Sequence, residues 1–357
     1  LLILYTSGST GAPKGAIMTE RAFIHEMKQD MVFVGDWDSS TVSIIDAPMA
    51  TSATPHNIIG TLLDGGRVCV FKDLVSGFDV CSEVGPTSLG MVPQMFAVLF
   101  KRYEQELRAL RNRFKSKNRG ERGEREGASS SLIKEEREIA LKWKYRHRIL
   151  GWRLGGVNCG GATPMPRVQQ WLKSIFQDEE CDVTENYAST EAGPITTTSG
   201  DPDSKTWGAI SNGVDVKLTD WKQYLSTDLP HPRGQICVKS DSSFSGYLGS
   251  ASSAPFFDEE GFFATGDIGE VVDVGPPMRI RVIDRCSNMF KLLNAEWVSP
   301  ENVEAELVAK CSLLRQIMVY GDSKHACTVA VVVPAQQPGD KAAILAQLAA
   351  CRCTPAQ

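Results

Sequence analysis

No run of apolar residues in this sequence comes close to the roughly 20 that a membrane-spanning helix needs. The ten cysteines contain no C-x-x-C pair and no paired metal-ligand spacing, and Cys351 with Cys353 is a weak signal. Cys69, Cys237 and Cys327 stand instead within apolar, strand-like runs. We therefore expect buried, reduced thiols in a cytoplasmic protein, with peripheral membrane association as the alternative.

Large apolar residues are also scarce between positions 111 and 131, where Phe114 is the only one. The wider segment 101–148 holds 16 of the 38 basic residues and 8 of the 43 acidic ones, so the rest of the chain is acidic. A stretch with so little apolar surface cannot order itself by burial. We expect a solvated surface insertion with helical flanks at Tyr103–Leu110 and Leu132–Tyr145. A polyanion-binding module is the alternative, but we expect no nucleic-acid partner, because aromatic residues are few and Glu is interspersed.

Apolar runs alternate with helix-like segments through much of the remaining chain. Strand-like runs occur at residues 1–4, 42–45, 67–71 and 89–92, and we expect the first to be buried. Helix-like segments occur at residues 19–31, 58–63, 168–176 and from residue 94, with Thr19 as the N-cap of the first. Such alternation predicts parallel βαβ units.

Short β-type runs with glycine and proline turns fill residues 207–283 and predict a small antiparallel part. A helix at 300–309 and strands at 316–320 and 327–333 follow. The predicted fold class is α/β, in three parts: an α/β domain of residues 1–205 that carries the insertion 101–148, a β-rich subdomain of residues 206–284, and a small α+β C-terminal domain of residues 285–357 after a hinge. Because the sequence starts inside an expected strand, we expect the first domain to be truncated and the last to be incomplete.

The densest group of candidate binding residues is YTSGSTGAPKG, Tyr5–Gly15. Glycines let backbone N–H groups face an anion, hydroxyls add donors, and Lys14 adds a positive charge. The usual nucleotide P-loop places its lysine directly after glycine and before Ser or Thr, whereas here Pro13 precedes Lys14 and Gly15 follows it. A flexible linker is the alternative, but an ordered Pro-Lys-Gly end after an apolar strand favours phosphate binding.

This stretch resembles the phosphate-binding signature of the adenylate-forming (AMP-binding) superfamily, which includes acyl-CoA synthetases, luciferases and the adenylation domains of peptide synthetases and carboxylic acid reductases. The resemblance implies that the loop holds the β- and γ-phosphates of ATP. The residues that match are Thr6, Ser7, Gly8, Ser9, Thr10, Gly11 and Lys14.

Two later stretches resemble the same superfamily in the expected order. Gly160, Gly161 and Ala162 match a segment whose backbone lies against the adenine and the acyl pocket. ENYASTEAG, residues 185–193, resembles the segment that supplies an adenine-stacking aromatic, an α-phosphate contact and a magnesium carboxylate. The resemblance gives these roles to Tyr187, Thr190 and Glu191, respectively. A carboxylate suits Mg²⁺, which prefers hard oxygen ligands.

Two further stretches complete the series. Asp267 closes a Thr-Gly-Asp triplet and, by resemblance, accepts hydrogen bonds from the ribose hydroxyls. Arg285 matches an arginine that contacts the ribose and phosphate, and Cys286 and Ser287 match the position where the superfamily pivots. Two residues depart from the pattern, because relatives have glycine at the positions of Ala188 and Ala295. The sequence also stops before the superfamily's C-terminal catalytic lysine.

The segments DLPHPRGQICVKSD (228–241) and LLRQIMVYGDSKHACTVAVVVP (313–334) resemble the adenylation domain of carboxylic acid reductases most, with long-chain fatty acyl-CoA synthetases as close kin. The resemblance implies an AMP-forming ligase that uses ATP and Mg²⁺ to convert a fatty or aromatic carboxylic acid to an acyl-adenylate with release of pyrophosphate. A thiol would then accept the acyl group. That thiol belongs either to CoA or to the phosphopantetheine of a carrier domain, and NADPH enters only if a reductase domain follows. A nucleotide-binding fragment with impaired catalysis is the alternative.

Overall fold

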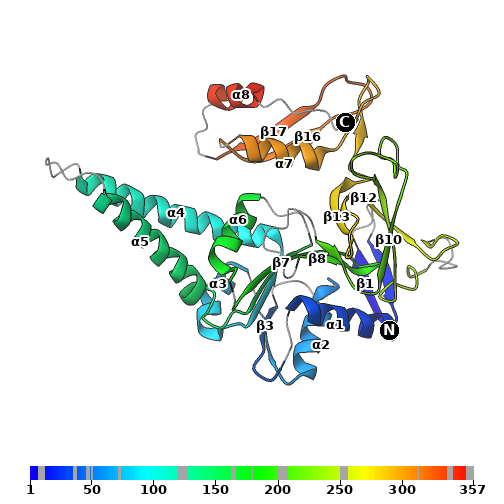
Figure 1. Cartoon of the computed structure of the whole chain (residues 1–357), viewed down its shortest axis with the longest axis horizontal. Coiled ribbons are helices and arrows are strands. Elements are labelled where there is room, and N and C mark those ends of the chain that lie inside the picture. Colours follow the sequence, from blue (N-terminus) through cyan, green and yellow to red (C-terminus); the bar gives the residue numbers. More distant parts are fainter. Residues whose placement is uncertain are drawn as a thin grey trace.

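The computed structural model describes residues 1–6, 13–34, 38–45, 49, 51–70, 74–118, 128–161, 166–178, 180–198, 208–249, 256–311, 313–335 and 341–350. Eleven strands within these residues form one mixed sheet at the centre of the molecule (Figure 1). In sheet order they are β10 (Val214–Thr219), β11 (Arg233–Ser240), β12 (Phe263–Asp273), β13 (Arg279–Arg285), β9 (Ala209–Ile210), β8 (Gly193–Thr197), β7 (Asp182–Ser189), β6 (Gly156–Gly160), β5 (Ser88–Met91), β3 (Val42–Ile45) and β4 (Arg67–Val70).

One half of the sheet is parallel. Strands β4, β3, β5, β6 and β7 pair in parallel, as the alternating pattern predicted. Their connections include α2 (Ala53–Leu63), α3 (Leu74–Val84) and α6 (Pro166–Phe176). Leu89, Val157 and Val183 of the central strands are buried in the largest apolar cluster, with Phe96 and Trp171 from neighbouring helices. Burial by helices explains why these strands read as apolar runs.

The other half is antiparallel and continues from the first without a break. The predicted β-type runs form β10, β11, β12 and β13, which pair antiparallel. Strand β7 pairs in parallel with β6 and antiparallel with β8, so the sheet changes direction at the turn between β7 and β8. Thr190 and Glu191 lie in that turn.

A hairpin precedes the sheet. Strands β1 (Leu2–Thr6) and β2 (Lys14–Met18) pair antiparallel, and β2 was not predicted. The expected burial of residues 1–4 is wrong for Leu1 and Ile3, which are exposed, and right for Leu4. Only one face of the hairpin packs on the core, so alternate residues face solvent. Thr19 caps α1 (Glu20–Val34) as predicted, because its Oγ1 accepts the Ala22 N–H at 3.1 Å.

The basic segment forms two antiparallel helices, α4 (Pro93–Asn118) and α5 (Ala128–Lys144), that project from the body (Figure 1). The helical flanks predicted for this segment are confirmed. Their inner ends belong to the core, because Tyr103 and Tyr145 are buried against Trp171. No helix of the described residues is long and apolar enough to cross a membrane.

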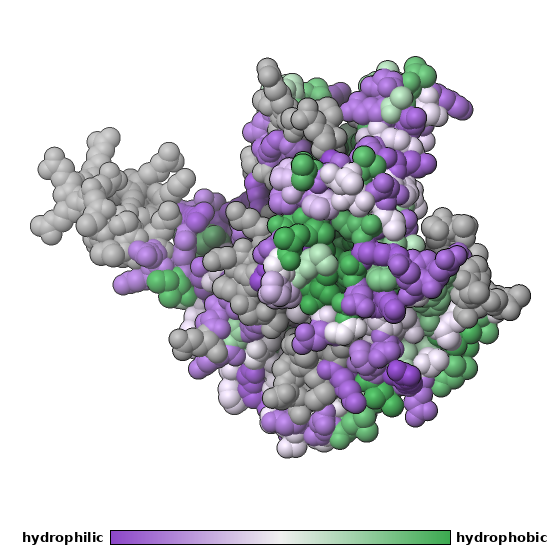
Figure 2. Space-filling view, turned by 45° about the vertical axis from the view of Figure 1, so that its right-hand side comes forward, coloured by the Kyte–Doolittle hydropathy of each residue, from purple (hydrophilic) through white to green (hydrophobic). Residues whose placement is uncertain are grey.

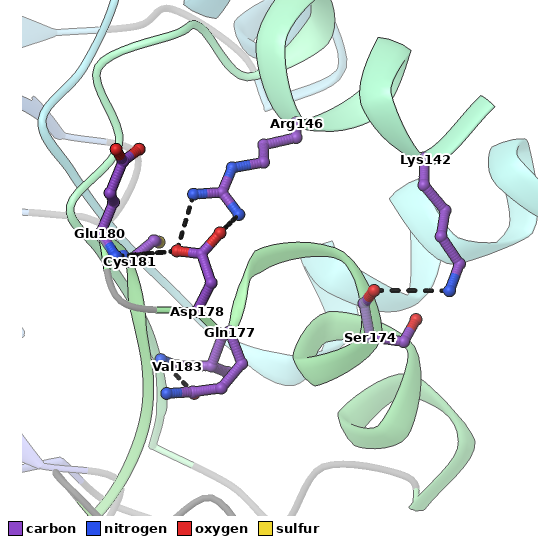
Figure 3. A network of polar contacts seen from close by, with 8 residues as sticks. All are labelled: Lys142, Arg146, Ser174, Gln177, Asp178, Glu180, Cys181 and Val183. Atoms are coloured by element: carbon purple, nitrogen blue, oxygen red, sulfur yellow. Dashed lines mark hydrogen bonds and ion pairs between the residues drawn. The ribbon is translucent and has the colours of Figure 1, made fainter. Parts of the chain in front are cut away.

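An ion pair between Arg146 and Asp178, with further hydrogen bonds to Asp178, holds the base of α5 (Figure 3). Arg146, in the π-helical turn Tyr145–Ile149, directs two N–H groups to the Asp178 carboxylate, and one of these bonds measures 2.9 Å. Asp178 also accepts the N–H groups of Glu180 and Cys181 at 2.9 Å. These contacts of Asp178 therefore join the end of α5 to the connection between α6 and β7.

The remaining elements form a smaller C-terminal part, drawn above the body in Figure 1. They are β14 (Phe290–Lys291), β15 (Trp297–Val298), α7 (Pro300–Lys310), β16 (Leu314–Tyr320), β17 (Val329–Pro334) and α8 (Lys341–Ala350). Cys311, Leu314 and Ile344 form its own small core. The helix and two strands predicted here are confirmed, whereas the domain boundaries stay predictions. Figure 2 shows an apolar area on the body beneath this part.

The cysteine expectation holds only in part. Cys237 is buried, but Cys69 is half-buried and Cys327 is exposed, so the expected burial of Cys327 is wrong. Cys327 precedes β17, whose Val329 and Val331 are exposed as well. An apolar run on an edge strand does not guarantee that both of its faces are covered.

Candidate active site

The predicted site residues that the structure describes lie on or next to four strands of the large sheet and on the N-terminal hairpin. Gly160 ends β6 and Gly161 follows it, Tyr187 lies in β7, and Asp267 and Arg285 lie in β12 and β13. Thr6 and Lys14 flank the phosphate loop, while Thr190 and Glu191 follow β7. Ser7, Gly8, Ser9, Thr10, Gly11 and Ala162 lie outside the described residues.

Tyr187, Asp267 and Arg285 meet in one cluster, although they come from three separate motifs. The Tyr187 hydroxyl donates to Asp267 Oδ2 at 2.7 Å, a contact that the sequence did not predict. Arg285 Nε lies 3.6 Å from Asp267 Oδ1, because the register of β12 and β13 places the two residues opposite each other. Arg285 is 60% exposed and Asp267 13% exposed, so the arginine faces solvent and the carboxylate lies at the edge of the core.

Local structure fixes the direction of Asp267. Gly266 has φ +81°, a left-handed conformation that L-residues rarely adopt. Thr265 Oγ1 accepts the Asp267 N–H at 3.1 Å and donates to the Ile236 carbonyl oxygen at 2.9 Å. The Thr-Gly-Asp triplet thus forms a turn in which each residue has a geometric role.

Burial dominates the electrostatics of this cluster. It raises the pKa of Asp267, while the Tyr187 hydrogen bond and the Arg285 charge pull in the opposite direction. Burial also raises the pKa of Tyr187 well above its ordinary value, so its hydroxyl stays protonated and donates. A carboxylate held in this way can accept hydrogen bonds from hydroxyl groups such as those of a ribose.

A second cluster lies at Glu191. Its Oε1 accepts a hydrogen bond from the Tyr247 hydroxyl at 2.8 Å. Lys14 Nζ lies 5.5 Å from the centroid of the same ring. The structure therefore brings the predicted lysine and carboxylate together around Tyr247, a residue that the sequence did not indicate. No local pattern around Tyr247 would have revealed it.

The glycines of β6 have a packing reason. Gly160 pairs with Asn186 of β7, and a Cβ at Gly160 would lie 2.1 Å from Asn186 Oδ1. Gly161 has φ +83°. A Cβ at position 160 would force the Asn186 side chain to move, and backbone conformation favours glycine at position 161. The carboxyl ends of β6 and β7, where these residues and Glu191 lie, form the edge at which open α/β sheets bind ligands.

Comparison with known proteins decides the family. The model of the family described as AMP-binding enzyme matches residues 1–248. The chain belongs to this family. The resemblance predicted from the motifs is confirmed.

Relatives within the AMP-binding family include two kinds of enzyme. The carboxylic acid reductase of Mycobacterium marinum (strain ATCC BAA-535 / M) is 33% identical over 346 residues, which cover 95% of this chain and 27% of that protein. Long chain acyl-CoA synthetase 6, peroxisomal, of Arabidopsis thaliana is 32% identical over 341 residues, 92% of this chain and 47% of that protein. The chain thus spans about a quarter of one relative and half of the other.

Solved structures agree with this assignment. The adenylation domain of a carboxylate reductase from Mycobacterium chelonae matches with a TM-score of 0.72 and 30% identity, over 94% of this chain and 48% of that one. The A-PCP didomain of carboxylic acid reductase from Segniliparus rugosus, in complex with AMP, matches with a TM-score of 0.75 and 28% identity, over 98% and 45%. The α/β fold predicted from the sequence is that of these adenylation domains.

The site chemistry suits the nucleotide and Mg²⁺ that the AMP-binding family implies. Glu191 offers hard oxygen donors, and Lys14 offers a positive charge near the ring of the same Tyr247. Among the residues that the structure describes, no group of three His, Cys, Asp or Glu side chains could hold a metal. A single carboxylate such as Glu191 is enough for a Mg²⁺ ion that binds together with substrate phosphates.

The two departures from the family pattern differ in the structure. Ala295 has φ +68°, in the left-handed region where glycine is favoured, so it adopts the backbone of the glycine it replaces. Ala188 lies exposed in β7, outside that region. Only Ala295 therefore carries a conformational cost.

Proposed function

We propose that this chain activates a carboxylic acid with MgATP, forming an acyl-adenylate and pyrophosphate. The contact of Tyr187, Asp267 and Arg285, at the sheet edge that also carries Glu191, is the observation that carries the proposal. Membership of the AMP-binding family supports it. So does the likeness to the Segniliparus rugosus adenylation domain, whose structure is in complex with AMP and a co-purified carboxylic acid.

Each residue has a distinct part in this reaction. Asp267 accepts hydrogen bonds from the ribose hydroxyls, and Arg285 contacts the ribose and phosphate from the solvent side. Lys14 and the phosphate loop hold the β- and γ-phosphates, and Thr190 contacts the α-phosphate. A Mg²⁺ ion held by Glu191 would neutralise phosphate charge.

The chemical step needs positioning more than covalent help from the protein. A carboxylate oxygen of the substrate attacks the α-phosphorus in line with the departing group. The bond from the α-phosphorus to the bridging oxygen breaks, and pyrophosphate leaves with that oxygen. The positive charge of Lys14 stabilises the negative charge that develops on the leaving pyrophosphate.

The acyl acceptor is proposed more broadly. A thiol of CoA or of a carrier phosphopantetheine fits both kinds of relative, the synthetase and the reductase. We propose a fatty or aromatic acid as substrate and the cytoplasm as location. NADPH takes part only where a reductase domain belongs to the same protein.

Pyrophosphate exchange tests the proposed function. The 357-residue chain is incubated with ATP, Mg²⁺, labelled pyrophosphate and a panel of fatty and aromatic acids. Acid-dependent exchange is expected, and Asp267→Ala should abolish most of it while the exposed-strand variant Asp215→Ala retains it. Nucleotide binding without exchange for any acid would favour the alternative, a nucleotide-binding fragment with impaired catalysis.

The polyanion-binding alternative gains no support from the helical projection. Basic residues of its described part pair with acids: Arg111 with Glu138, Lys144 with Glu106, and Arg146 with Asp178. Such pairs lower the net field that a polyanion would meet.

A further inference from the structure

The Tyr247 side chain lies against both Glu191 and Lys14. Its hydroxyl donates to Glu191 Oε1 at 2.8 Å, and its ring centroid lies 5.5 Å from Lys14 Nζ. Lys14 and Glu191 are 177 positions apart in the sequence, so this one side chain joins the two predicted phosphate and metal residues.

The backbone around Tyr247 joins the same two elements. Residues 245–248 lie beside β2 as a further antiparallel segment, with Tyr247 opposite Ala16. Three hydrogen bonds hold it there: Ile17 N–H to Gly246 O at 2.9 Å, Leu248 N–H to Gly15 O at 2.8 Å, and Ser245 N–H to Ile17 O at 2.9 Å. Phe244 N–H then donates to Glu191 O at 2.8 Å. The segment is therefore bonded both to the strand that begins with Lys14 and to the turn that carries Glu191.

Packing fixes the ring of Tyr247. Phe244 and Phe256 meet it edge-on, with centroid distances of 4.9 and 5.0 Å. The packed ring sets the direction of the Tyr247 hydroxyl toward the Glu191 carboxylate before any ligand binds.

We propose that Tyr247 is a positioning residue for metal–nucleotide binding. Its hydroxyl holds the Glu191 carboxylate in one orientation for a divalent cation, and its ring limits where the Lys14 ammonium group lies. This inference rests on the proposed function, because it assigns Glu191 and Lys14 to the MgATP site. A purely structural tyrosine would serve the aromatic cluster through its ring alone.

The two parts of the side chain can be separated by substitution. Tyr247→Phe keeps the ring and its packing but removes the hydroxyl, so Glu191 must be ordered when the metal binds. Ordering one flexible side chain corresponds to a loss of about two- to tenfold in affinity. Tyr247→Leu removes the ring as well and should also release Lys14, which contacts phosphate without the help of a metal.

Calorimetric titration of the 357-residue chain tests the inference. Ligands are ATP with Mg²⁺, ATP with EDTA, and AMP. Tyr247→Phe is expected to weaken MgATP binding about two- to tenfold and to raise the Mg²⁺ concentration needed for half-maximal ATP binding, with AMP affinity unchanged. Tyr247→Leu should in addition weaken ATP binding in EDTA. Tyr103→Phe, which removes a hydroxyl from a tyrosine buried at the base of α4, is the matched control and should change none of these affinities.

The outcomes distinguish the inference from the function beneath it. MgATP binding by Tyr247→Phe equal to that of the wild type would overturn the inference alone. Equal losses of AMP and MgATP would also overturn it, because they would indicate a general structural role. A wild-type chain without Mg²⁺-dependent ATP binding would overturn the proposed function, and the inference with it.

Discussion

Ala295 adopts a backbone conformation that does not suit an L-residue. Its φ is +68°, and its N–H donates to the Leu292 carbonyl oxygen at 3.0 Å in a tight turn. The left-handed conformation costs an L-residue about 1–2 kcal/mol. Glycine would avoid this cost, but its greater conformational freedom in the unfolded state would offset part of the gain in stability. We predict that Ala295→Gly raises the free energy of unfolding by about 0.5–1 kcal/mol, measured by urea denaturation.

Ala188→Gly is the matched control, because the superfamily has glycine at that position too. Ala188 lies in β7 opposite Pro194 and outside the left-handed region. Glycine in a strand costs roughly 0.5–1 kcal/mol relative to alanine, so this variant should be less stable than the wild type. Stabilisation at both positions would contradict the account of Ala295.

Asp267 makes the stability of the chain depend on pH. Its folded pKa is raised, chiefly by burial, above the ordinary value of 3.8. The folded state therefore binds this proton more tightly than the unfolded state. The stabilisation is complete below the ordinary pKa and is lost as pH rises through the folded pKa. We predict that Asp267→Asn, which does not ionise, gains stability relative to the wild type as pH rises above the ordinary aspartate pKa and through the raised one, as measured by urea midpoints.

Asp220→Asn should show the opposite trend. Hydrogen bonds from the Ser226 backbone and hydroxyl lower the pKa of Asp220. Its contribution is therefore present above the ordinary aspartate pKa and is lost as pH falls through the lowered one. Parallel pH profiles for the two variants would contradict this assignment of causes.

The motifs predicted Tyr187, Asp267 and Arg285 as neighbours of one nucleotide, and the structure places them in contact. The Glu191–Tyr247 contact could not be predicted, because its partners are 56 positions apart and no spacing rule connects them. Tyr247 reaches Glu191 only because residues 245–248 pair with β2. Contacts of this kind depend on how strands pair, which a single sequence does not encode locally.

Among the elements, helix α7 takes its N-terminal cap from a distant strand. Ser299 occupies the N-cap position but makes no capping bond through its side chain. Asp284, at the end of β13, is buried and accepts the Glu301 N–H at 3.1 Å and the Ser299 hydroxyl at 2.5 Å. The cap thus fastens the C-terminal part to the large sheet.

We predict that Asp284→Ala lowers the free energy of unfolding by about 1–3 kcal/mol, because α7 loses its cap and the Ser299 hydroxyl loses a buried acceptor. Thermal and urea unfolding measure the change. Asp215→Ala, in the exposed part of β10, is the control and should stay within about 0.5 kcal/mol of the wild type. Equal effects of the two substitutions would show that the cap contributes nothing.

The helical projection should tolerate loss of its outer part. Deleting residues 112–131 removes the stretch in which Phe114 is the only large apolar residue, whereas the buried Tyr103 and Tyr145 remain. We predict an unchanged unfolding midpoint and unchanged AMP affinity for this deletion. Tyr145→Ala, by contrast, should cost roughly 3–5 kcal/mol, the usual loss for a large aromatic side chain in a core. A collapse of the deletion variant would show that the outer part packs on the body.

Helix α2 buries polar residues such as Thr54, His56 and Thr61, whereas Leu62 and Leu63 are exposed. Periodicity predicts α6, which buries Val168, Leu172 and Ile175 on one face. It missed β2, because Lys14–Met18 follows a glycine-rich loop and a hairpin partner outside the window decides its conformation. Charge dominates the composition of residues 101–148 and predicts a solvated insertion, but the inner ends of α4 and α5 are buried. Tyr103 and Tyr145, at these inner ends, are buried in the largest apolar cluster.

At the scale of the whole molecule, one sheet joins the parts that the sequence suggested as separate. Strand β7 pairs with parallel β6 and antiparallel β8, and the turn between β7 and β8 carries Thr190 and Glu191. The sequence predicted both pairing types but not their continuity, because strand order depends on contacts between distant segments. The change of direction therefore coincides with the candidate site.

The central claim is that one nucleotide lies across this site, with its ribose at Asp267 and its outer phosphates at Lys14. Titration of the chain and two variants with MgATP and AMP tests it most directly. Lys14→Ala should weaken MgATP binding by about ten- to a hundredfold, the value of one charge-assisted contact, and should spare AMP. Asp267→Ala should weaken both ligands alike, because the ribose is common to them. Equal loss of AMP in both variants, or MgATP affinity unchanged by Lys14→Ala, would contradict the account.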